Sequence, residues 1–170
     1  MVSIRRAQLR DVPALQEMIN YYAVKQIMLP RTLTDLYECV REFLVAEENG
    51  EIAGCGALKL YNQELGEIRS LCVAPGVQTR GVGRALTDRL LGEADQFGLR
   101  TVFALTMVTD FFLKCGFHES LRERFPMKVW RDCLRCERYS RCREKTVSID
   151  LAVDSAKDAQ PKAETAEIPA

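Results

Sequence analysis

The chain has 170 residues, 47% of them hydrophobic, which is enough for one well-packed domain and little more. Its 24 basic residues balance its 24 acidic residues, so no overall charge favours nucleic acid or a membrane surface as a partner. No apolar run approaches the ~20 residues that a membrane-spanning helix needs. We therefore expect no nucleic acid and no membrane among its partners.

Cysteine usage indicates the compartment. The chain has seven cysteines, an odd number, and four of them are scattered singly, at Cys39, Cys55, Cys72 and Cys115. Scattered thiols are typical of a reducing compartment rather than of a disulfide scaffold. The N-terminus begins at once with strand-like residues instead of a targeting segment. We expect a cytoplasmic protein, and a homodimer is compatible with the sequence.

The first third of the chain alternates between strand and helix patterns. Residues 2–7 are predicted to form a strand, after which Asp11 is placed as the N-cap of a helix and Pro13 lies in its first turn. The helix is indicated by an apolar stripe at helical spacing, which comprises Val12, Leu15, Met18, Ile19 and Tyr22.

A second helix is predicted over residues 35–41 and is followed by two strands, over residues 43–46 and 52–60. Asn49-Gly50 lies between these two apolar runs, and this dipeptide is a strong signal for a hairpin turn.

The rest of the chain continues the alternation. The predicted elements are a strand over 66–74, a helix from Val82 that ends at Gly98, a strand over 101–106, a short helix over 110–115 and a strand over 145–151. Together these elements predict a mixed α/β sheet within a single domain of residues 1–152. Residues 153–170 contain almost no large apolar residue and are predicted to be a disordered tail.

A glycine loop opens directly into the long predicted helix. Its sequence is Gln78-Thr79-Arg80-Gly81-Val82-Gly83. Unpaired N–H groups and the helix dipole converge at a helix N-terminus, and glycine allows a ligand to approach the backbone closely. The loop therefore predicts a site for a phosphorylated ligand.

The order of strand, Gln-x-x-Gly-x-Gly loop, helix, short strand and Phe-Phe-Leu-Lys-Cys-Gly-Phe (residues 111–117) resembles the GNAT family of acetyl-CoA-dependent N-acetyltransferases. The resemblance covers roughly residues 4–151. A Rossmann loop is excluded because its third glycine is missing and a long αβ segment precedes the loop. The resemblance implies an α/β fold with a mixed, mostly antiparallel sheet that splays at its centre and is flanked by helices.

The resemblance also implies the residues that bind acetyl-CoA. Backbone N–H groups of the loop and first helical turn would hold the pyrophosphate, with Arg80 and Arg84 adding charge. The preceding strand would pair with the pantetheine arm and polarise the thioester carbonyl through one N–H group. The expected contacts are Leu71, Cys72, Val73, Gln78, Thr79, Arg80, Gly81, Val82, Gly83 and Arg84.

A narrower resemblance is to the acetyltransferase domain of the N-acetylglutamate synthases, closest to their short, single-domain bacterial form. The stretches that carry it are residues 4–7, 27–32, 67–73, 102–106 and 130–136. It implies transfer of acetyl from acetyl-CoA to the α-amine of an amino acid, L-glutamate, as the first step of arginine biosynthesis.

Catalysis of that reaction needs a group that takes a proton from the acceptor ammonium. Glu67 matches the family position proposed as the general base. No tyrosine lies between residues 101 and 117, where the family commonly places an acid, so Thr109 is the hydroxyl chosen. Cys72 suggests an acetyl-cysteine intermediate, but no base flanks it and the one histidine is His118. We expect direct transfer within a ternary complex.

The acceptor has two carboxylates, which call for cationic side chains. Arg31 matches a substrate-binding arginine of these synthases, and Arg143 or Lys145 would bind the other carboxylate. Arg69 shares a strand face with Glu67, so it is expected to be either a salt-bridge partner or a third clamp. Ser70 completes the expected substrate contacts.

The cysteines at Cys133, Cys136 and Cys142 have part of the spacing of a metal site, and thiolates suit zinc or an iron–sulfur cluster. A fourth ligand would have to be His118, Cys115 or a partner chain. A redox-sensitive pair and unligated thiols are the alternatives. No metal is therefore assigned to the chemistry.

Two other functions stay open at this point. The first is a GNAT enzyme acting on another amine, such as a protein N-terminus or a lysine. The second is a non-catalytic regulator that binds acyl-CoA.

Overall fold

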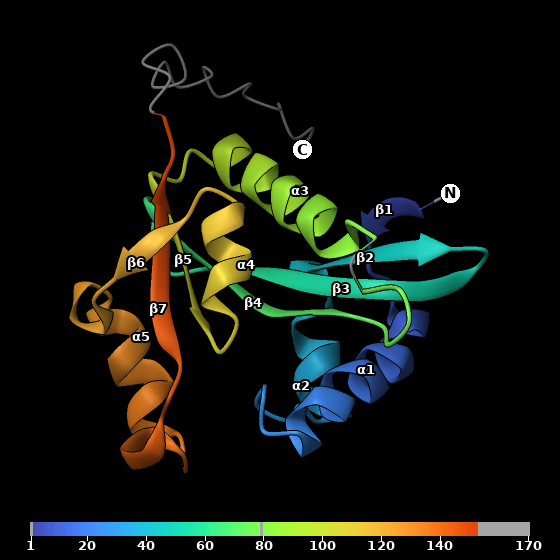
Figure 1. Cartoon of the computed structure of the whole chain (residues 1–170), viewed down its shortest axis with the longest axis horizontal. Helices are drawn as coiled ribbons and strands as arrows, with labels where there is room; N and C mark the ends of the chain where they lie inside the picture. Colours follow the sequence, from blue (N-terminus) through green and yellow to red (C-terminus); the bar gives the residue numbers. More distant parts are fainter. Residues whose placement is uncertain (1, 79, 153–170) are drawn as a thin grey trace, which may run out of the picture.

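The computed structural model of the chain describes residues 2–78 and 80–152. Within these ranges, seven strands form one sheet in the order β1-β2-β3-β4-β5-β7-β6 (Figure 1). Neighbouring strands run antiparallel except β4 and β5, which are parallel, so the predicted mixed sheet is confirmed. The strands are β1 (Val2–Arg6), β2 (Phe43–Glu48), β3 (Glu51–Leu60), β4 (Leu65–Val73), β5 (Thr101–Thr106), β6 (His118–Ser120) and β7 (Lys145–Asp150). The predicted tail, residues 153–170, lies outside the described residues.

Helices cover both faces of the sheet (Figure 1). They are α1 (Val12–Val24), α2 (Leu33–Glu38), α3 (Val82–Gln96), α4 (Thr109–Lys114) and α5 (Pro126–Arg131). Single 3₁₀ turns occur at η1 (Leu9–Asp11), η2 (Val40–Glu42), η3 (Arg122–Arg124), η4 (Cys133–Arg135) and η5 (Tyr139–Arg141). Among the helices described, none combines the length and the apolarity needed to cross a membrane.

The two faces of the sheet form separate cores because side chains alternate along each strand. In β2, Phe43 and Val45 pack with α1 and α2, whereas Leu44 and Ala46 pack with α3 and α4. The helices α1 and α2 therefore cover one face of the central strands, and α3 and α4 cover the other.

The local signals in the sequence are confirmed at the turns. Asn49 and Gly50 have φ values of 55° and 84°, which is the type I′ geometry that joins β2 to β3. Gly98 ends α3 with a φ of 74°, as expected for a left-handed cap.

The predicted start of the second helix was wrong, whereas Asp11 is the N-cap residue of α1 as predicted. The second helix begins at Leu33, because Thr32 and Asp35 exchange side-chain-to-backbone hydrogen bonds of 3.1 and 3.2 Å in a capping box. Asp11 precedes α1 but its side chain does not cap that helix. Its carboxylate instead accepts hydrogen bonds of 2.7 Å from Arg5 and from the Gln8 N–H group.

The segment between α4 and β7 contains β6, α5 and three 3₁₀ turns, which the sequence does not predict. The six residues of α5 are fewer than two helical turns, too short for an apolar stripe to repeat. Tertiary packing positions this helix. Phe125, the residue before it, stacks on Phe103 of β5 with ring centroids 4.2 Å apart.

Candidate active site

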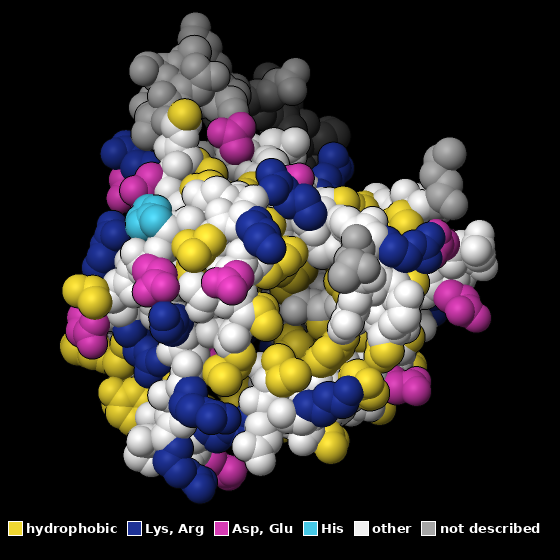
Figure 2. Space-filling model, viewed as in Figure 1, with side chains coloured by type: hydrophobic (Ala, Val, Ile, Leu, Met, Phe, Trp, Pro, Cys, Tyr) yellow, Lys and Arg dark blue, Asp and Glu magenta, His cyan; other side chains and the backbone are white. Residues whose placement is uncertain are grey.

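A cavity opens where the two parallel strands separate. β4 and β5 pair only from Leu65–Thr101 to Glu67–Phe103, and beyond that point they diverge. The cavity has a volume of about 980 Å³ and is lined by β4 from Glu67 to Val73, by residues 105–108, and by the start of α3. Figure 2 shows a hollow on this face with hydrophobic side chains around it and Lys and Arg side chains near its rim. The predicted central splay is thus confirmed and forms the site.

The N-terminus of α3 faces one end of this cavity. Gly81 precedes the helix with a φ of 82°, and the first hydrogen bond that returns to it runs 2.9 Å from the Ala85 N–H group to the Gly81 carbonyl. The N–H groups of the first turn therefore have no acceptor within the helix. A Cβ atom on Gly83 would lie 3.3 Å from the Phe111 ring, so glycine keeps the space above the first turn open.

Most of the predicted acetyl-CoA contacts line the cavity, namely Leu71, Cys72, Val73, Gln78, Gly81, Val82, Gly83 and Arg84. Thr79 lies outside the described residues. Arg80 does not line the cavity, because its guanidinium donates hydrogen bonds of 2.9 and 2.7 Å to both oxygens of Glu48. Arg84 is held along the helix by Asp88, at 2.9 Å.

The strand β4 changes direction at the cavity. Ser70 has a φ of 52°, and the pairing register with β3 shifts between Cys55 and Ala57, which marks a bulge at Ser70 and Leu71. Past Glu67, this edge of β4 is unpaired with β5, so its backbone groups are available to an extended, amide-containing arm. The anion-binding helix start, the open strand edge and the apolar lining together fit coenzyme A.

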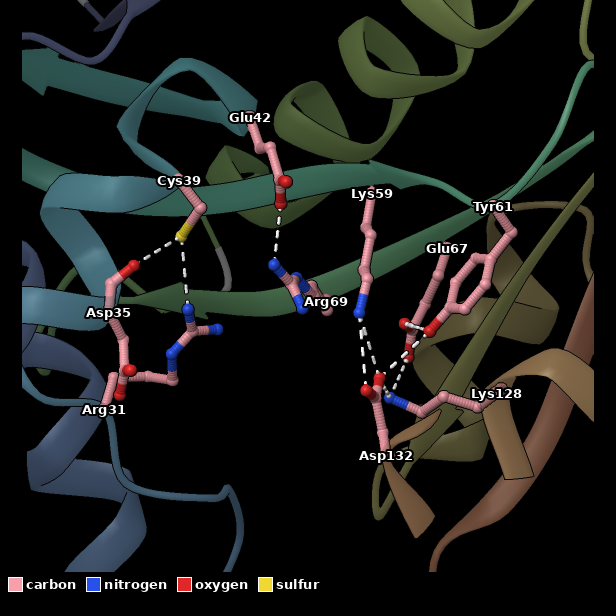
Figure 3. A network of polar contacts seen from close by, with 10 residues as sticks. All are labelled: Arg31, Asp35, Cys39, Glu42, Lys59, Tyr61, Glu67, Arg69, Lys128 and Asp132. Atoms are coloured by element: carbon pink, nitrogen blue, oxygen red, sulfur yellow. Dashed lines mark hydrogen bonds and ion pairs between the residues drawn. The ribbon is translucent and has the colours of Figure 1, made fainter. Parts of the chain in front are cut away.

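A buried polar cluster forms the floor at the other end of the cavity (Figure 3). Glu67 is 2% exposed. Its Oε1 atom lies 2.8 Å from the Nζ atom of Lys128, and its Oε2 atom accepts a hydrogen bond of 2.9 Å from the Tyr61 hydroxyl. Lys128 belongs to α5, so the segment between α4 and β7 contributes directly to this end of the cavity.

Asp132 and Lys59 complete this cluster. Asp132 Oδ2 lies 3.0 Å from Lys128 Nζ and 3.2 Å from Lys59 Nζ. Burial alone would raise the pKa of Asp132, but the charges and hydrogen bonds of Lys128 and Lys59 together outweigh it and hold that pKa well below its usual range. Burial, followed by the charges of Glu67 and Asp132, raises the pKa of Tyr61, so its hydroxyl stays protonated at neutral pH.

Two arginines line the cavity opposite this cluster (Figure 3). Asn20 holds the Arg31 backbone through hydrogen bonds of 2.9 and 3.0 Å, and the Arg31 Nη2 atom lies 3.1 Å from Cys39 Sγ. Arg69 forms an ion pair of 2.7 Å with Glu42, so of its two expected roles the salt bridge with Glu67 is wrong. The Arg69 Nε atom is buried and has no hydrogen-bond partner among the described residues.

Three other predicted site residues lie outside this cavity. Lys145 begins β7, is exposed, and its Nζ atom pairs with Glu119 of the neighbouring strand β6 at 3.2 Å. Arg143 lines a separate pocket of about 70 Å³. Thr109 begins α4, and the neighbouring Thr106 lines the cavity in its place. The sequence alone could not show which of these residues line the cavity, because that depends on how the strands and loops pack in three dimensions.

Several lining residues were missed by the sequence analysis, namely Tyr22, Lys114, Lys128, Asp132 and Glu144. The Lys128 and Asp132 pair has the i, i+4 spacing of a helical ion pair, which is the one signal that could have indicated α5. Burial raises the pKa of Glu144, although Lys128 and Arg122 partly offset it. Nothing in the local pattern indicates that this carboxylate reaches the cavity.

The three cysteines between β6 and β7, Cys133, Cys136 and Cys142, are free thiols. Cys133 is buried, and Cys142 Sγ accepts a hydrogen bond of 3.3 Å from Arg122. In residues 2–78 and 80–152, no group of three or more His, Cys, Asp or Glu side chains is arranged to hold a metal ion. The structure thus gives no geometric support for the metal site left open by the spacing.

Comparisons with known proteins agree with this geometry. Residues 9–117 match the acetyltransferase (GNAT) family. The chain therefore belongs to the GNAT family of acetyltransferases. It is an acyltransferase, and acetyl-CoA is its co-substrate.

Individual proteins of known name or structure are similar to this chain over most of its length. A Mycobacterium tuberculosis protein named amino-acid acetyltransferase is 45% identical over 119 residues, which are 68% of this chain and 68% of that protein. Rv2747 from M. tuberculosis, solved in complex with CoA and NLQ, has a TM-score of 0.75 at 34% identity and covers 88% of this chain and 99% of its own. N-acetylglutamate synthase from Neisseria gonorrhoeae, solved with CoA and N-acetyl-glutamate, has a TM-score of 0.81 at 28% identity. It covers 89% of this chain, which matches 35% of that longer protein.

Proposed function

We propose that this enzyme transfers acetyl from acetyl-CoA to the α-amine of an amino acid, L-glutamate, the first step of arginine biosynthesis. The observation that carries the proposal is the buried carboxylate of Glu67 at the point where β4 and β5 separate. It faces the same cavity as the glycine loop and as two arginines. The names of the M. tuberculosis relative and of the N. gonorrhoeae synthase support an amino-acid acceptor.

The donor half of the site binds and activates acetyl-CoA. N–H groups at the start of α3 bind the pyrophosphate, and the open edge of β4 binds the pantetheine arm. One N–H group among Leu71, Cys72 and Val73 donates to the thioester oxygen. A donor of this kind is worth about 10²–10³ in rate, because it stabilises the negative charge that develops on that oxygen.

The acceptor half supplies the proton acceptor. Glu67 takes a proton from the acceptor ammonium, directly or through one water, and the free amine attacks the thioester carbonyl. The C–N bond forms, the C–S bond breaks, and coenzyme A leaves as a thiolate. The nitrogen then carries one proton more than a neutral amide, and water passes this proton to the departing thiolate, which leaves the acetylated amine and the free thiol of coenzyme A. The acetyl group therefore passes directly to the amine in a ternary complex.

Charge at the acceptor end selects an anionic amino acid. Arg31 makes no ion pair with a carboxylate within the described part of the chain, so its guanidinium is available to the side-chain carboxylate of glutamate. Arg69 adds positive charge beside it, although Glu42 already occupies its Nη2 atom.

A panel of amino-acid acceptors tests the proposal. The wild-type chain is incubated with acetyl-CoA and each acceptor, thiol release is followed, and the product mass is measured. We expect the largest kcat/KM with L-glutamate and a product heavier by one acetyl group. Acetyl-CoA binding is measured separately by calorimetry as a control for folding. Turnover with a peptide N-terminus or a lysine but none with glutamate would overturn the proposal.

A further inference from the structure

A second cation is missing from the predicted acceptor site. An amino acid has a carboxylate on the same carbon as its reactive amine, so that carboxylate must lie within a few ångströms of the proton acceptor. Lys145 faces away from the cavity and Arg143 lines another pocket. The residue that supplies a cation beside Glu67 is instead Lys128, which lies beyond residues 9–117 that match the family.

The position of Lys128 is set by packing rather than by a local pattern. Phe125 is buried against Phe103, and Pro126 follows it at the first position of α5. One turn further on, the Lys128 side chain reaches Glu67 and is only 13% exposed. Lys128 lines the cavity together with Glu67 and Asp132. Its ammonium group therefore belongs to the floor on which the acceptor must lie.

The donors of Lys128 leave room for a ligand. Two of the three N–H groups are directed at Glu67 Oε1, at 2.8 Å, and at Asp132 Oδ2, at 3.0 Å. The third N–H group has no acceptor among the described residues, while the side chain borders the cavity. Burial would lower the pKa of Lys128, but Glu67 and then Asp132 outweigh it and raise that pKa, so the group stays charged.

The chemistry of the cluster matches a zwitterion. An α-amino acid carries adjacent positive and negative charges, and Glu67 and Lys128 present adjacent negative and positive charges in reverse order. The cluster has two cations, Lys59 and Lys128, and two anions, Glu67 and Asp132. A zwitterion adds no net charge to this buried balance, whereas a simple amine would add an uncompensated cation.

We propose that Lys128 binds the α-carboxylate of the acceptor while Glu67 receives the proton of the α-amine. This inference rests on the proposed amino-acid acetyltransferase function and assigns a specificity role to α5. Arg31 and Arg69 then serve the side chain of the acceptor on the opposite side of the cavity. The enzyme is thereby selective for α-amino acids over amines that lack the carboxylate.

The test compares two acceptors in two proteins. L-glutamate is compared with 4-aminobutyrate, which is the same molecule without its α-carboxylate, in the wild type and in Lys128→Met. We expect the preference for glutamate in kcat/KM to fall by about 10- to 100-fold in the variant, as for the loss of one charged hydrogen bond. Lys128→Arg keeps the charge and should restore most of the preference.

A purely structural role gives a different result. If Lys128 only holds Glu67 in place, both acceptors lose the same factor and the preference does not change, which overturns the inference. Lys25→Met is the matched control, because Lys25 is exposed, contacts Tyr21 and does not line the cavity. Acetyl-CoA affinity and urea unfolding of each variant show that the fold is intact.

One further comparison uses the wild-type protein alone. In the wild type, glutamate with its α-carboxylate converted to an amide should lose a similar factor in kcat/KM, and an unchanged value overturns the inference even if Lys128→Met does not fold. The proposed function fails separately, when the wild type acetylates no amino acid in the panel. That result is visible before any comparison of acceptors and overturns both proposals.

Discussion

The Phe125 ring stacks on the Phe103 ring with centroids 4.2 Å apart and planes within 9°, and this contact joins α5 to the central strand β5. Both rings are buried beside Tyr61. The stack therefore holds α5, and with it Lys128, in place at the polar cluster on the floor of the cavity. We therefore expect the same contact to affect both the stability of the protein and the binding of the acceptor.

Removal of this ring should destabilise the protein and weaken acceptor binding together. Phe125→Ala leaves a cavity under α5 and should lower the free energy of unfolding by about 3 kcal/mol, measured by urea denaturation. The KM for the acceptor should rise while acetyl-CoA affinity changes little, because the donor half belongs to β4 and α3. Phe97→Ala is the control, since Phe97 is 57% exposed. Equal effects of the two changes would contradict this account of the stack.

Glu67→Gln tests the proton acceptor. The amide has the same shape as the carboxylate but cannot take the proton, so kcat should fall about 10²- to 10⁴-fold. Acetyl-CoA affinity, measured by calorimetry, should stay nearly constant. Glu64→Gln is the matched control, because Glu64 is exposed and its ion pair with Arg100 lies on the surface. A kcat within a few-fold of the wild type would rule out Glu67 as the base.

Cys72 should be dispensable as a nucleophile. Its Sγ atom is buried, 3.5 Å from the Sγ atom of Cys55, and no basic side chain contacts it within the described ranges. Hydrogen bonding to Cys72, then burial, raises the pKa of the neighbouring Cys55 thiol, so no thiolate beside Cys72 is available as a base. Cys72→Ala should keep kcat within a few-fold. Initial rates should show sequential kinetics, and ping-pong kinetics with a captured acetyl-enzyme would refute direct transfer.

Gly81, which precedes α3, and Gly92, which lies within it, provide a matched pair. Gly81→Ala forces a side chain into a left-handed backbone with a φ of 82° and should cost about 1–2 kcal/mol. It should also weaken acetyl-CoA binding several-fold, since the first N–H groups of α3 shift. Gly92 is helical with nothing near its Cβ position, so Gly92→Ala should stabilise the protein by about 0.5–1 kcal/mol. Opposite shifts in the thermal midpoint are the expected readout.

Acid should unfold the protein partly through Asp132 and Asp11. Lys128 lowers the pKa of Asp132 against the effect of burial, and the hydrogen bond from Arg5 lowers that of Asp11. Because both values lie below the ordinary 3.8, the unfolded chain binds these protons more readily. Their contribution to stability is complete above pH 3.8 and is lost as the pH falls further. Asp132→Asn and Asp11→Asn should each flatten the decline in urea midpoint as the pH falls from about 4 to about 2. A decline as steep as in the wild type would contradict this assignment.

The fold and the donor half of the site could be predicted from the sequence because their signals are local. The Asn49-Gly50 hairpin, the Gly98 cap and the glycine loop each depend on a backbone conformation that a few adjacent residues determine. Glu67 was assigned through its match to the family position proposed as the general base, and it lies on the strand that leads to that loop.

The acceptor half could not be predicted in the same way. The pairing of Glu67 with Lys128, the pairing of Arg69 with Glu42 and the outward direction of Lys145 all join or separate residues far apart in the chain. The spacing of charged residues along the chain does not indicate which of them pair in the fold. The helix α5 is also too short to show an apolar periodicity of its own. Local signals in the sequence therefore predicted most of the strands and helices and the glycine loop at the start of α3, and the family resemblance added the splay and its carboxylate. Only the tertiary structure decided which cations reach that carboxylate, because the stacking of Phe125 on Phe103 is what brings α5 to it.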